Sequence, residues 1–484
     1  MPQKSLKKNA LLNFIKSVLN TAYPIITFPY ASRILMPEGL GKVNFANSVI
    51  EYFLIIAELG ISTYAVREAA KIRDNRERLS KFCREILCMH ILSTIFAYLL
   101  LAVGFIFVDK INEYRILIII SSVKILFSTI DIGWFYTALE EYGYITIRHA
   151  VFQIISLIAL FTLVKRPEDY HIYAAIGVFS NVGSYLVNFL HARKFIDLFR
   201  HTRLELRRHL KPILTFFGIS CATKLNTALD AVMLGFMFGD RAVGFYAAAF
   251  KLTKLVIELI TSVISIFMPR SSYYLEANRT DEYRKIISKV CGMTYFFALP
   301  ASAGLFFLSR PLLSTFSGDA YLPAAQSMRI LSIGIIAWCT NSFLGNLIIT
   351  PQRKERFSLA AQIVAAACNI ILNVVLIRKY GVLGAAIATV IVEFITATIL
   401  LFPSWKYIHS RNSAKNIVKA LAGTLIMYGI IHHAFGNIQN DALAILCSAV
   451  TGCVVYALFE ILMKNETAQM LCGILTKRRN ARPR

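Results

Sequence analysis

Three charged side chains stand in an otherwise apolar stretch, YAAAFKLTKLVIEL at residues 246–259. Lys251, Lys254 and Glu258 are spaced three and four positions apart, so on a helix they lie within one narrow arc. An ionisable side chain at the bilayer centre costs roughly 2.5–3.5 kcal/mol, so each should face protein or a water-filled cavity. Lys254 and Glu258 have the spacing of a helical salt bridge, which is the purely structural interpretation. Lys251 then has no carboxylate partner of its own on the helix, which favours a cavity for an anionic ligand.

Polar stripes of the same kind run along other apolar segments near the start of each half of the chain. Residues 41–62 carry amides and carboxylates on one side, and residues 9–32 and 212–238 each carry a lysine among asparagine, serine and threonine. Lipid cannot satisfy these groups, so we expect the four stripes to face one another across an aqueous cavity. The expected cationic lining is Lys16, Lys224, Lys251, Lys254 and Arg329. The expected polar lining is Asn13, Asn20, Asn44, Asn47 and Asn226.

Carboxylates on these stripes are candidates for binding a coupling ion, H⁺ or Na⁺: Glu51, Glu58, Asp230 and Glu258. Lys124 and Asp131 are seven positions apart in one apolar segment, so we expect them to share a helical face and make polar contacts inside a bundle. Pro24 and Pro29 each remove a backbone hydrogen bond and permit a kink, either as a static bend or as a hinge.

The elements that position these residues are predicted to be transmembrane helices. Of the 484 residues, 56% are hydrophobic and only 17% are charged, and the mean hydropathy is +0.58. Apolar stretches long enough to cross about 30 Å of hydrocarbon recur from end to end. We predict an all-α integral membrane protein with about 14 transmembrane helices. Their expected spans are 9–32, 41–62, 85–108, 115–137, 149–165, 171–193, 212–238, 242–268, 290–309, 324–350, 357–377, 381–403, 420–436 and 441–463.

The distribution of positive charge predicts the orientation of the chain in the membrane. The formal charge of +24 would suggest a nucleic-acid partner in a soluble protein. Most of the 52 Lys and Arg residues, however, fall in every second connection, as the positive-inside rule requires. We therefore expect both termini in the cytoplasm and no nucleic-acid partner. The basic tail TKRRNARPR is interpreted as a topology determinant rather than as a site for anionic lipid or a partner.

Two bundles of six helices are expected around a central cavity, followed by a C-terminal helix pair. The expected regions are 1–200, 201–410 and, for the last two helices and the basic tail, 411–484. The segments EGLGKVNFANSV, DRAVGFYAAAFK and KYGVLGAAIATV each combine a glycine with small residues at a helix entry, which is consistent with a parallel repeat. The alternative is that small residues recur because they let membrane helices approach closely.

Nothing in the sequence indicates a nucleotide, metal or redox centre. There is no phosphate-binding glycine-rich loop of the Walker type. The nine cysteines are scattered, without a paired or metal-binding spacing, so they are interpreted as packing residues without disulfides. We expect no cofactor and no metal.

Two segments resemble a known family. SRILMPEGLGKVNFANSVIEYFLIIAELGISTYAVREAAKIRDN at residues 32–75 resembles the second-helix region of Wzx-type polysaccharide flippases of the multidrug/oligosaccharidyl-lipid/polysaccharide exporter superfamily. NIILNVVLIRKYGVLGAAIATVIVE at residues 369–393 is similar to the eleventh and twelfth helices of that family. Helix number and spacing extend the resemblance over nearly the whole chain.

The resemblance implies a transporter of the bacterial inner membrane and no enzymatic activity. It would move an undecaprenyl-diphosphate-linked oligosaccharide from the cytoplasmic to the periplasmic leaflet by alternating access, for O-antigen or other surface polysaccharide biosynthesis. Its implied partners are the lipid-linked oligosaccharide, membrane lipids and the polysaccharide polymerase and ligase machinery. Cationic lumen residues are a theme of the family, matched here by location alone at Lys16, Lys224, Lys251 and Lys254.

Other functions remain open at this stage. A flippase for the peptidoglycan lipid precursor shares the fold, the helix number and the pyrophosphate. A drug:cation antiporter of the same superfamily fits less well, because such proteins usually have twelve helices and bind cations through acidic residues. A membrane scaffold would use the polar stripes only to hold helices together. Glycosyl transfer lacks a convincing pair of acidic residues.

Overall fold

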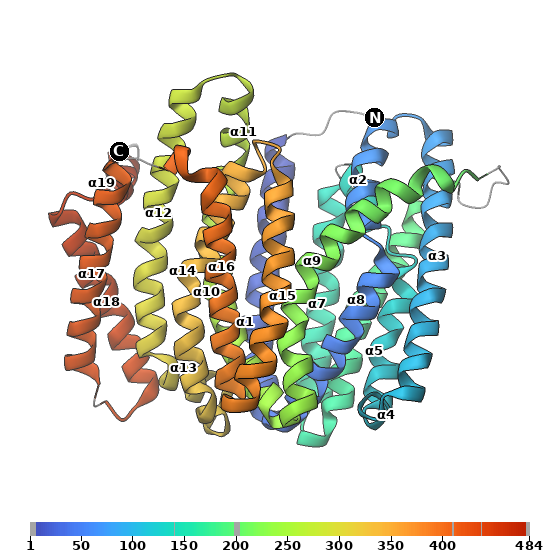
Figure 1. Ribbon diagram of the computed structural model, residues 1–484, viewed down its shortest axis with the longest axis horizontal. Helices are drawn as coiled ribbons and strands as arrows, with labels where there is room; N and C mark the ends of the chain where they lie inside the picture. The colour runs from blue at the N-terminus through green and yellow to red at the C-terminus, as the bar shows by residue number, and fades with distance from the viewer. Residues whose placement is uncertain (1–5, 140, 198–203, 409–410, 437, 481–484) are drawn as a thin grey trace. The chain divides into compact units, whose positions relative to one another are not determined.

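The computed structural model describes residues 6–139, 141–197, 204–408, 411–436 and 438–480, without the side chains of 6–21, 142, 219–220, 222–227, 411 and 474–480. Every regular element in these ranges is a helix, which confirms the all-α prediction (Figure 1). Contacts between residues divide the chain into two compact units, Met1–Gly244 (unit 1) and Phe245–Arg484 (unit 2). This division falls later in the chain than the expected lobe boundary after residue 200, which stays a prediction, as does the boundary after residue 410.

Unit 1 contains nine α-helices, one short 3₁₀ helix and the start of a tenth α-helix within its described residues. The helices are α1 (Leu6–Glu58), α2 (Ile61–Ile72), α3 (Arg76–Phe107), α4 (Asp109–Glu113), α5 (Arg115–Ser128), α6 (Gly133–Ala138), α7 (Tyr142–Leu163), η1 (Pro167–Asp169), α8 (Tyr170–Ala192), α9 (Arg207–Phe238) and the first residues of α10 (Asp240–Ser265). One core cluster joins α2, α3, α6 and α9 around the buried rings of Trp134, Phe135 and Tyr136.

A single break divides α1 into the two helices predicted at 9–32 and 41–62. Met36 has φ 58° and ψ 172°, outside the helical region. It precedes Pro37, whose ring disfavours helical backbone at the residue before it. Pro24 and Pro29 lie within the regular helix before this break. The chain therefore changes direction at Met36 rather than at either of the prolines singled out in the sequence.

The predicted span 115–137 is interrupted, which corrects one expectation. Helix α5 ends at Ser128, and Asp131 Oδ1 accepts a hydrogen bond from the Gly133 backbone nitrogen at 2.9 Å at the start of α6. An aspartate that binds a backbone N–H two residues ahead stabilises a turn and competes with helix continuation. Lys124 and Asp131 consequently do not share a face of one helix.

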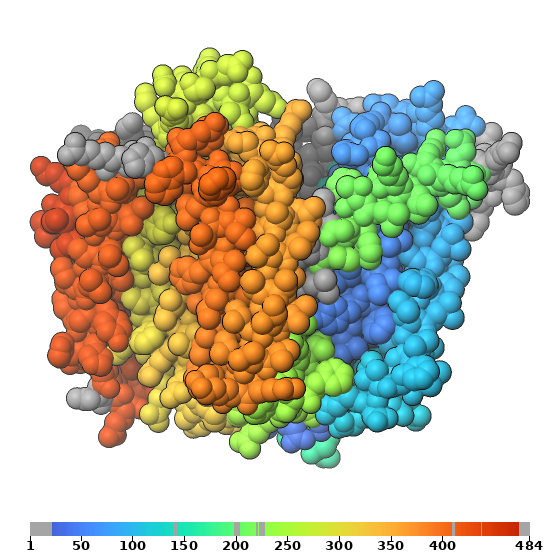
Figure 2. All heavy atoms as spheres, in the orientation of Figure 1, coloured from blue at the N-terminus to red at the C-terminus, as the bar shows by residue number. Residues whose placement is uncertain are grey.

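Unit 2 contains the remainder of α10 and the helices that follow it. These are α11 (Met268–Glu276), α12 (Thr280–Phe307), α13 (Ser309–Ser317), η2 (Asp319–Ala324), α14 (Ala325–Leu344), the π-helical turn η3 (Gly345–Ile349), α15 (Glu355–Tyr380), α16 (Val382–Ile408), α17 (Arg411–Phe435), α18 (Asp441–Leu462) and α19 (Glu466–Asn480). Helix α12 packs against both α14 and α17. In Figure 2 its surface is recessed between α16 and the α17–α18 pair. The Tyr456 hydroxyl donates to the Phe296 carbonyl at 2.8 Å and joins α18 to α12.

Eleven helical segments of the described chain are long and apolar enough to cross a membrane. The segment Ala22–Ile72 holds the predicted span 41–62 and residues 22–32 of the span 9–32. The span 115–137 is interrupted, and within 212–238 the apolar helix Ala228–Phe238 is shorter than a membrane crossing. Large apolar side chains such as Phe107 and Phe402 are 78% and 84% exposed, as expected for surfaces that face lipid. The chain is therefore a multi-pass membrane protein, whereas the number of fourteen spans stays a prediction.

The glycines at the three similar helix entries each lie where two backbones meet. In unit 1, a Cβ on Gly41 would lie 1.8 Å from the Asp240 carbonyl oxygen, and a Cβ on Gly244 would lie 1.9 Å from that of Pro37. In unit 2, a Cβ on Gly384 would lie 2.0 Å from the Leu376 carbonyl oxygen. Close backbone approach is thus confirmed as one reason for the pattern. The internal repeat stays a prediction.

Candidate functional site

The charged stripe of α10 forms one weak ion pair and leaves one lysine without a partner. Lys254 Nζ lies 3.9 Å from Glu258 Oε1, and the two side chains are 51% and 46% exposed. The expected i,i+4 pair is therefore present. Lys251 is less exposed, and its ammonium makes no hydrogen bond or ion pair with any residue that the structure describes. The α10 stripe thus carries a positive charge that its own helix does not neutralise.

The predicted polar residues of α1 have different surroundings within unit 1. Asn47 Oδ1 accepts a hydrogen bond from Lys124 Nζ of α5 at 2.8 Å, which confirms a polar contact inside the bundle for this lysine. Asn44 donates instead to the Leu40 carbonyl of its own helix at 2.8 Å. Such a bond satisfies the amide locally and leaves its other hydrogen-bonding groups available.

The four acidic candidates differ in burial. Asp230 of α9 is 3% exposed, and Glu58 of α1 is partly buried. Both take part in further polar interactions. Glu51 and Glu258 are exposed side chains. A carboxylate that binds and releases a proton must be reachable by water in some conformation, so burial alone does not select among the four.

Arg329 lies in a different part of unit 2 from the α10 lysines. Its guanidinium is 5.8 Å from the centre of the Phe306 ring, and it lines a cavity of about 740 Å³ together with Arg310. Trp338 of the same helix, α14, contacts Phe250 of α10 with ring centres 5.9 Å apart. Arg329 is nine positions earlier on α14, about 13 Å along the axis. Lys251 does not line the cavity that Arg329 lines, and a shared cationic lining for the two residues stays a prediction.

Five predicted residues fall outside the described side chains, so their roles stay predictions. They are Asn13, Lys16, Asn20, Lys224 and Asn226.

Unit 1 contains a second polar site, a cavity of about 310 Å³ between α2, α6, α7 and α8. Asp131, Arg148 and Tyr185 line it. Arg148 Nη1 donates to the Ser184 carbonyl at 3.5 Å. An arginine and an aspartate lining one small cavity stabilise each other's charge, so this site is interpreted as part of the helix packing.

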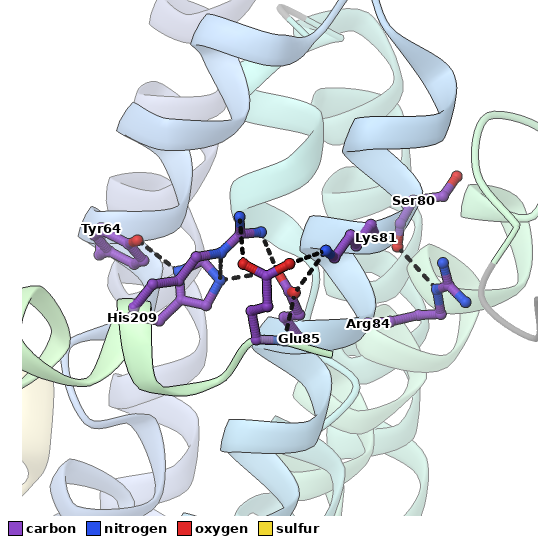
Figure 3. A network of polar contacts seen from close by, with 8 residues as sticks. Tyr64, Ser80, Lys81, Arg84, Glu85 and His209 are labelled. Atoms are coloured by element: carbon purple, nitrogen blue, oxygen red, sulfur yellow. Dashed lines mark hydrogen bonds and ion pairs between the residues drawn. The ribbon is translucent and has the colours of Figure 1, made fainter. Parts of the chain in front are cut away.

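A buried carboxylate network that the sequence did not reveal joins α2, α3 and α9 (Figure 3). Glu85 of α3 is 0% exposed, and its Oε2 lies 2.9 Å from His209 Nε2 and also accepts from Arg208. The Tyr64 hydroxyl lies 2.7 Å from His209 Nδ1. When Nε2 carries the ring proton, His209 donates to Glu85 and accepts from Tyr64 at Nδ1, and Arg208 Nε, 3.1 Å from Nε2, then makes no hydrogen bond there.

The loop before α9 is fixed to the same network. The Glu205 backbone nitrogen donates to Glu85 Oε1 at 2.9 Å, and Lys81 Nζ lies 2.5 Å from Glu205 Oε1. The hydrogen bond from Lys81 holds the pKa of Glu205 below its usual value. This network therefore ties the connection between the expected lobes to α3. Its only sequence signal is one glutamate at the start of an apolar span that follows a basic stretch.

The family model for polysaccharide biosynthesis proteins matches residues 6–275, and the MatE model matches residues 217–375. The chain is 26% identical over 404 residues to a Shigella dysenteriae protein named as an O-antigen transporter, which covers 82% of this chain and 99% of that protein. It is 20% identical over 393 residues to the Staphylococcus aureus capsular polysaccharide biosynthesis protein CapF, which covers 80% of this chain and 96% of that protein.

Solved structures with a similar fold include the lipid II flippase MurJ in an inward closed conformation. That similarity has a TM-score of 0.76 at 18% identity and covers 95% of this chain and 99% of MurJ. An inward-facing multidrug resistance MATE family transporter of the MOP superfamily has a TM-score of 0.62 at 12% identity, over 82% of this chain and 98% of that one. These findings confirm the resemblance that the two sequence segments indicated. The chain is a multi-pass membrane protein that belongs to the polysaccharide biosynthesis protein family and has the fold of MurJ and the MATE transporters.

Proposed function

We propose that this protein is a flippase for a lipid-linked glycan used in surface polysaccharide biosynthesis. Its substrate is an undecaprenyl-diphosphate-linked oligosaccharide, which it moves from the cytoplasmic to the periplasmic leaflet of the inner membrane by alternating access. The family membership supports this proposal, as do the relatives named for O-antigen transport and capsular polysaccharide biosynthesis. Such a transporter binds and releases its substrate without forming or breaking covalent bonds.

The observation that carries the proposal is the unpaired ammonium of Lys251 on a membrane-spanning helix. A charge in that position is costly unless it faces protein, water or a ligand. A pyrophosphate group must leave water to cross the membrane, and charge-assisted hydrogen bonds from lysine compensate for that loss. Lys254 lies about one helical turn from Lys251 and adds a second positive charge, which Glu258 balances only in part. Lys16 and Lys224 complete the proposed cationic lining.

Ion coupling is assigned to one of the four acidic residues, Glu51, Glu58, Asp230 or Glu258. A carboxylate that binds H⁺ or Na⁺ loses this ability when it is replaced by the corresponding amide. The variant in which the coupling carboxylate is replaced by its amide should retain substrate binding, but its transport should no longer respond to an imposed ion gradient. A variant whose transport still follows the gradient removes its residue from the set.

The structural similarity to MurJ keeps a second candidate function, a flippase for the peptidoglycan lipid precursor. The two functions differ in their cellular consequence. Loss of a peptidoglycan precursor flippase stops growth, whereas loss of a surface polysaccharide flippase removes surface polymer. Antiport of drugs is a third possibility that the MatE match keeps open, and it is tested by drug resistance of the deletion strain.

Gene deletion tests the proposal in cells. Lipid-linked oligosaccharide in the inner membrane and polymer at the cell surface are measured after complementation with wild type, Lys251→Ala or Lys251→Arg. We expect accumulation of the lipid-linked units and loss of polymer in the deletion strain, rescue by wild type and by Lys251→Arg, and failure of well-expressed Lys251→Ala. Unchanged lipid-linked units and polymer after deletion would remove this substrate class.

A further inference from the structure

Unit 2 contains a strongly basic pocket that the proposed transport function does not use. Its volume is about 660 Å³, and it lies where α12 and α17 begin, α16 ends and α19 begins. Figure 1 shows these helix ends at the same end of unit 2. Four cationic side chains line the pocket: Arg284, Lys285, Lys289 and Lys406. Glu466 is the only carboxylate in the described lining, so four cations and one anion give the lining a formal charge of +3.

The floor of the pocket is a packed and hydrogen-bonded junction of three helices. A Cβ on Gly292 of α12 would lie 3.8 Å from Thr467 Oγ1 and 3.9 Å from Asn416 Cβ, so the three helices meet there. Asn416 and Thr467 are 6% and 4% exposed. The hydroxyl groups of Ser288 and Ser413 are hydrogen bonded at 2.7 Å and connect α12 to α17.

A buried asparagine fixes the start of α19 against α17. Asn465 is 1% exposed, donates from its side chain to the Asn416 carbonyl at 3.2 Å and accepts from the Thr467 nitrogen at 3.0 Å. The floor is therefore held by hydrogen bonds that do not involve the cations. Removing a lysine from the rim should leave the junction intact.

The cations on the rim are not neutralised by the protein. Arg284, Lys285 and Lys289 make no ion pair or hydrogen bond with any residue whose side chain is described. The Lys406 ammonium lies 4.9 Å from the centre of the Tyr407 ring, a contact that leaves its hydrogen-bond donors free. All four cationic side chains are exposed, so water screens much of their mutual repulsion, and an anion bound between them would be attracted by each. Phosphate suits both guanidinium and ammonium donors.

We propose that this pocket binds a phosphate-bearing anion, as the headgroup of an anionic phospholipid or as free phosphate. The same end of α16 favours a lipid source. Phe402 lies one helical turn from Lys406 on the same face and is 84% exposed, and Trp405 is 62% exposed. Exposed aromatic side chains beside cations are typical of the membrane interface, and basic pockets between helices bind anionic headgroups there. The proposal does not depend on the identity of the transported substrate.

The test uses the full-length protein purified in detergent and measures retained phosphatidylglycerol by native mass spectrometry. Wild type is compared with the double variant Lys285→Gln/Lys289→Gln, and Lys415→Gln serves as the control, because Lys415 is exposed on α17 but does not line the pocket. Each cation near an anionic headgroup contributes roughly a fivefold gain in affinity, so the double variant should bind about 25-fold more weakly. Lys289→Arg keeps the charge and should retain the lipid.

A second arm distinguishes the two sources of phosphate. Inorganic phosphate is added to delipidated protein, and its protection against heat is compared with that of phosphatidylglycerol and of zwitterionic phosphatidylcholine. Lipid-selective protection that is lost in the double variant supports the headgroup. Saturable protection by inorganic phosphate that is lost in the same variant supports free phosphate. The proposal is overturned if wild type and the double variant retain phosphatidylglycerol equally and phosphate protects neither.

Discussion

Replacing Glu85 tests whether the carboxylate network of unit 1 holds α9 and its preceding loop against α3. Glu85→Ala removes the acceptor for His209 Nε2 and for the Glu205 backbone nitrogen. Each buried donor left without an acceptor costs about 1–3 kcal/mol. Arg208 also loses its contact with Glu85, but it stays 3.8 Å from Glu205 Oε2 and its side chain is 47% exposed, so water compensates for most of that loss. Two such donors would cost about 2–6 kcal/mol, and the lower part of that range, about 2–4 kcal/mol, is expected because the Glu205 nitrogen is only partly buried.

The assay is the temperature at which half of the detergent-solubilised protein leaves the monodisperse peak in size-exclusion chromatography. For units of this size 1 kcal/mol corresponds to about 2–4 °C, so Glu85→Ala should lower this temperature by about 5–15 °C. Glu205→Ala is the matched control: Lys81 Nζ lies 3.9 Å from Glu85 Oε1 and 2.5 Å from Glu205 Oε1, but the Glu205 side chain is 57% exposed and its variant keeps the backbone nitrogen. A shift for Glu85→Ala no larger than that for Glu205→Ala would refute the reasoning.

Two further predictions concern packing and hydrogen bonding in unit 1. Gly41→Ala should reduce the yield of monodisperse folded protein sharply, because its Cβ would meet the Asp240 carbonyl. Gly177→Ala is the control and should be tolerated, because nothing lies within 4 Å of its Cβ. Equal yields of the two variants would contradict the packing argument. Asn47→Leu removes the acceptor of the Lys124 ammonium and should destabilise the protein by about 1.5–3 kcal/mol, more than Asn44→Leu, in thermal unfolding. The opposite order would show that this bond contributes little.

The helical secondary structure and the membership of the chain among multi-pass membrane proteins are well predicted from the sequence, because both follow from local hydropathy and segment length. The Lys254–Glu258 pair is equally local, since a spacing of four on one helix determines it. The break at Met36 lies in the gap between the expected spans 9–32 and 41–62, although nothing in the sequence specifies its backbone angles. The interruption after Ser128 was missed, because the apolar run continues through a turn that the side chain of Asp131 stabilises.

The long-range polar contacts were beyond sequence reasoning. Glu85 and Arg208 are separated by 123 positions, and nothing in their local spacing indicates that they meet. The same holds for the basic pocket, whose cations come from the start of α12 and the end of α16. In the sequence these residues belong to clusters that the positive-inside rule already explains. Only the fold shows which of them converge on one cavity.

The central claim is tested most directly by transport in vesicles. The purified protein is reconstituted into liposomes with an undecaprenyl-diphosphate-linked oligosaccharide in both leaflets, and an added glycosidase measures how fast the inner pool becomes accessible. Wild type should expose the inner pool of oligosaccharide to the glycosidase. Lys251→Ala should slow the rate of exposure by about tenfold or more, as expected for the loss of a charge-assisted hydrogen bond. Lys379→Ala, which removes an exposed lysine of α15, should leave the rate unchanged. Exposure by wild type no faster than in protein-free liposomes would contradict the account.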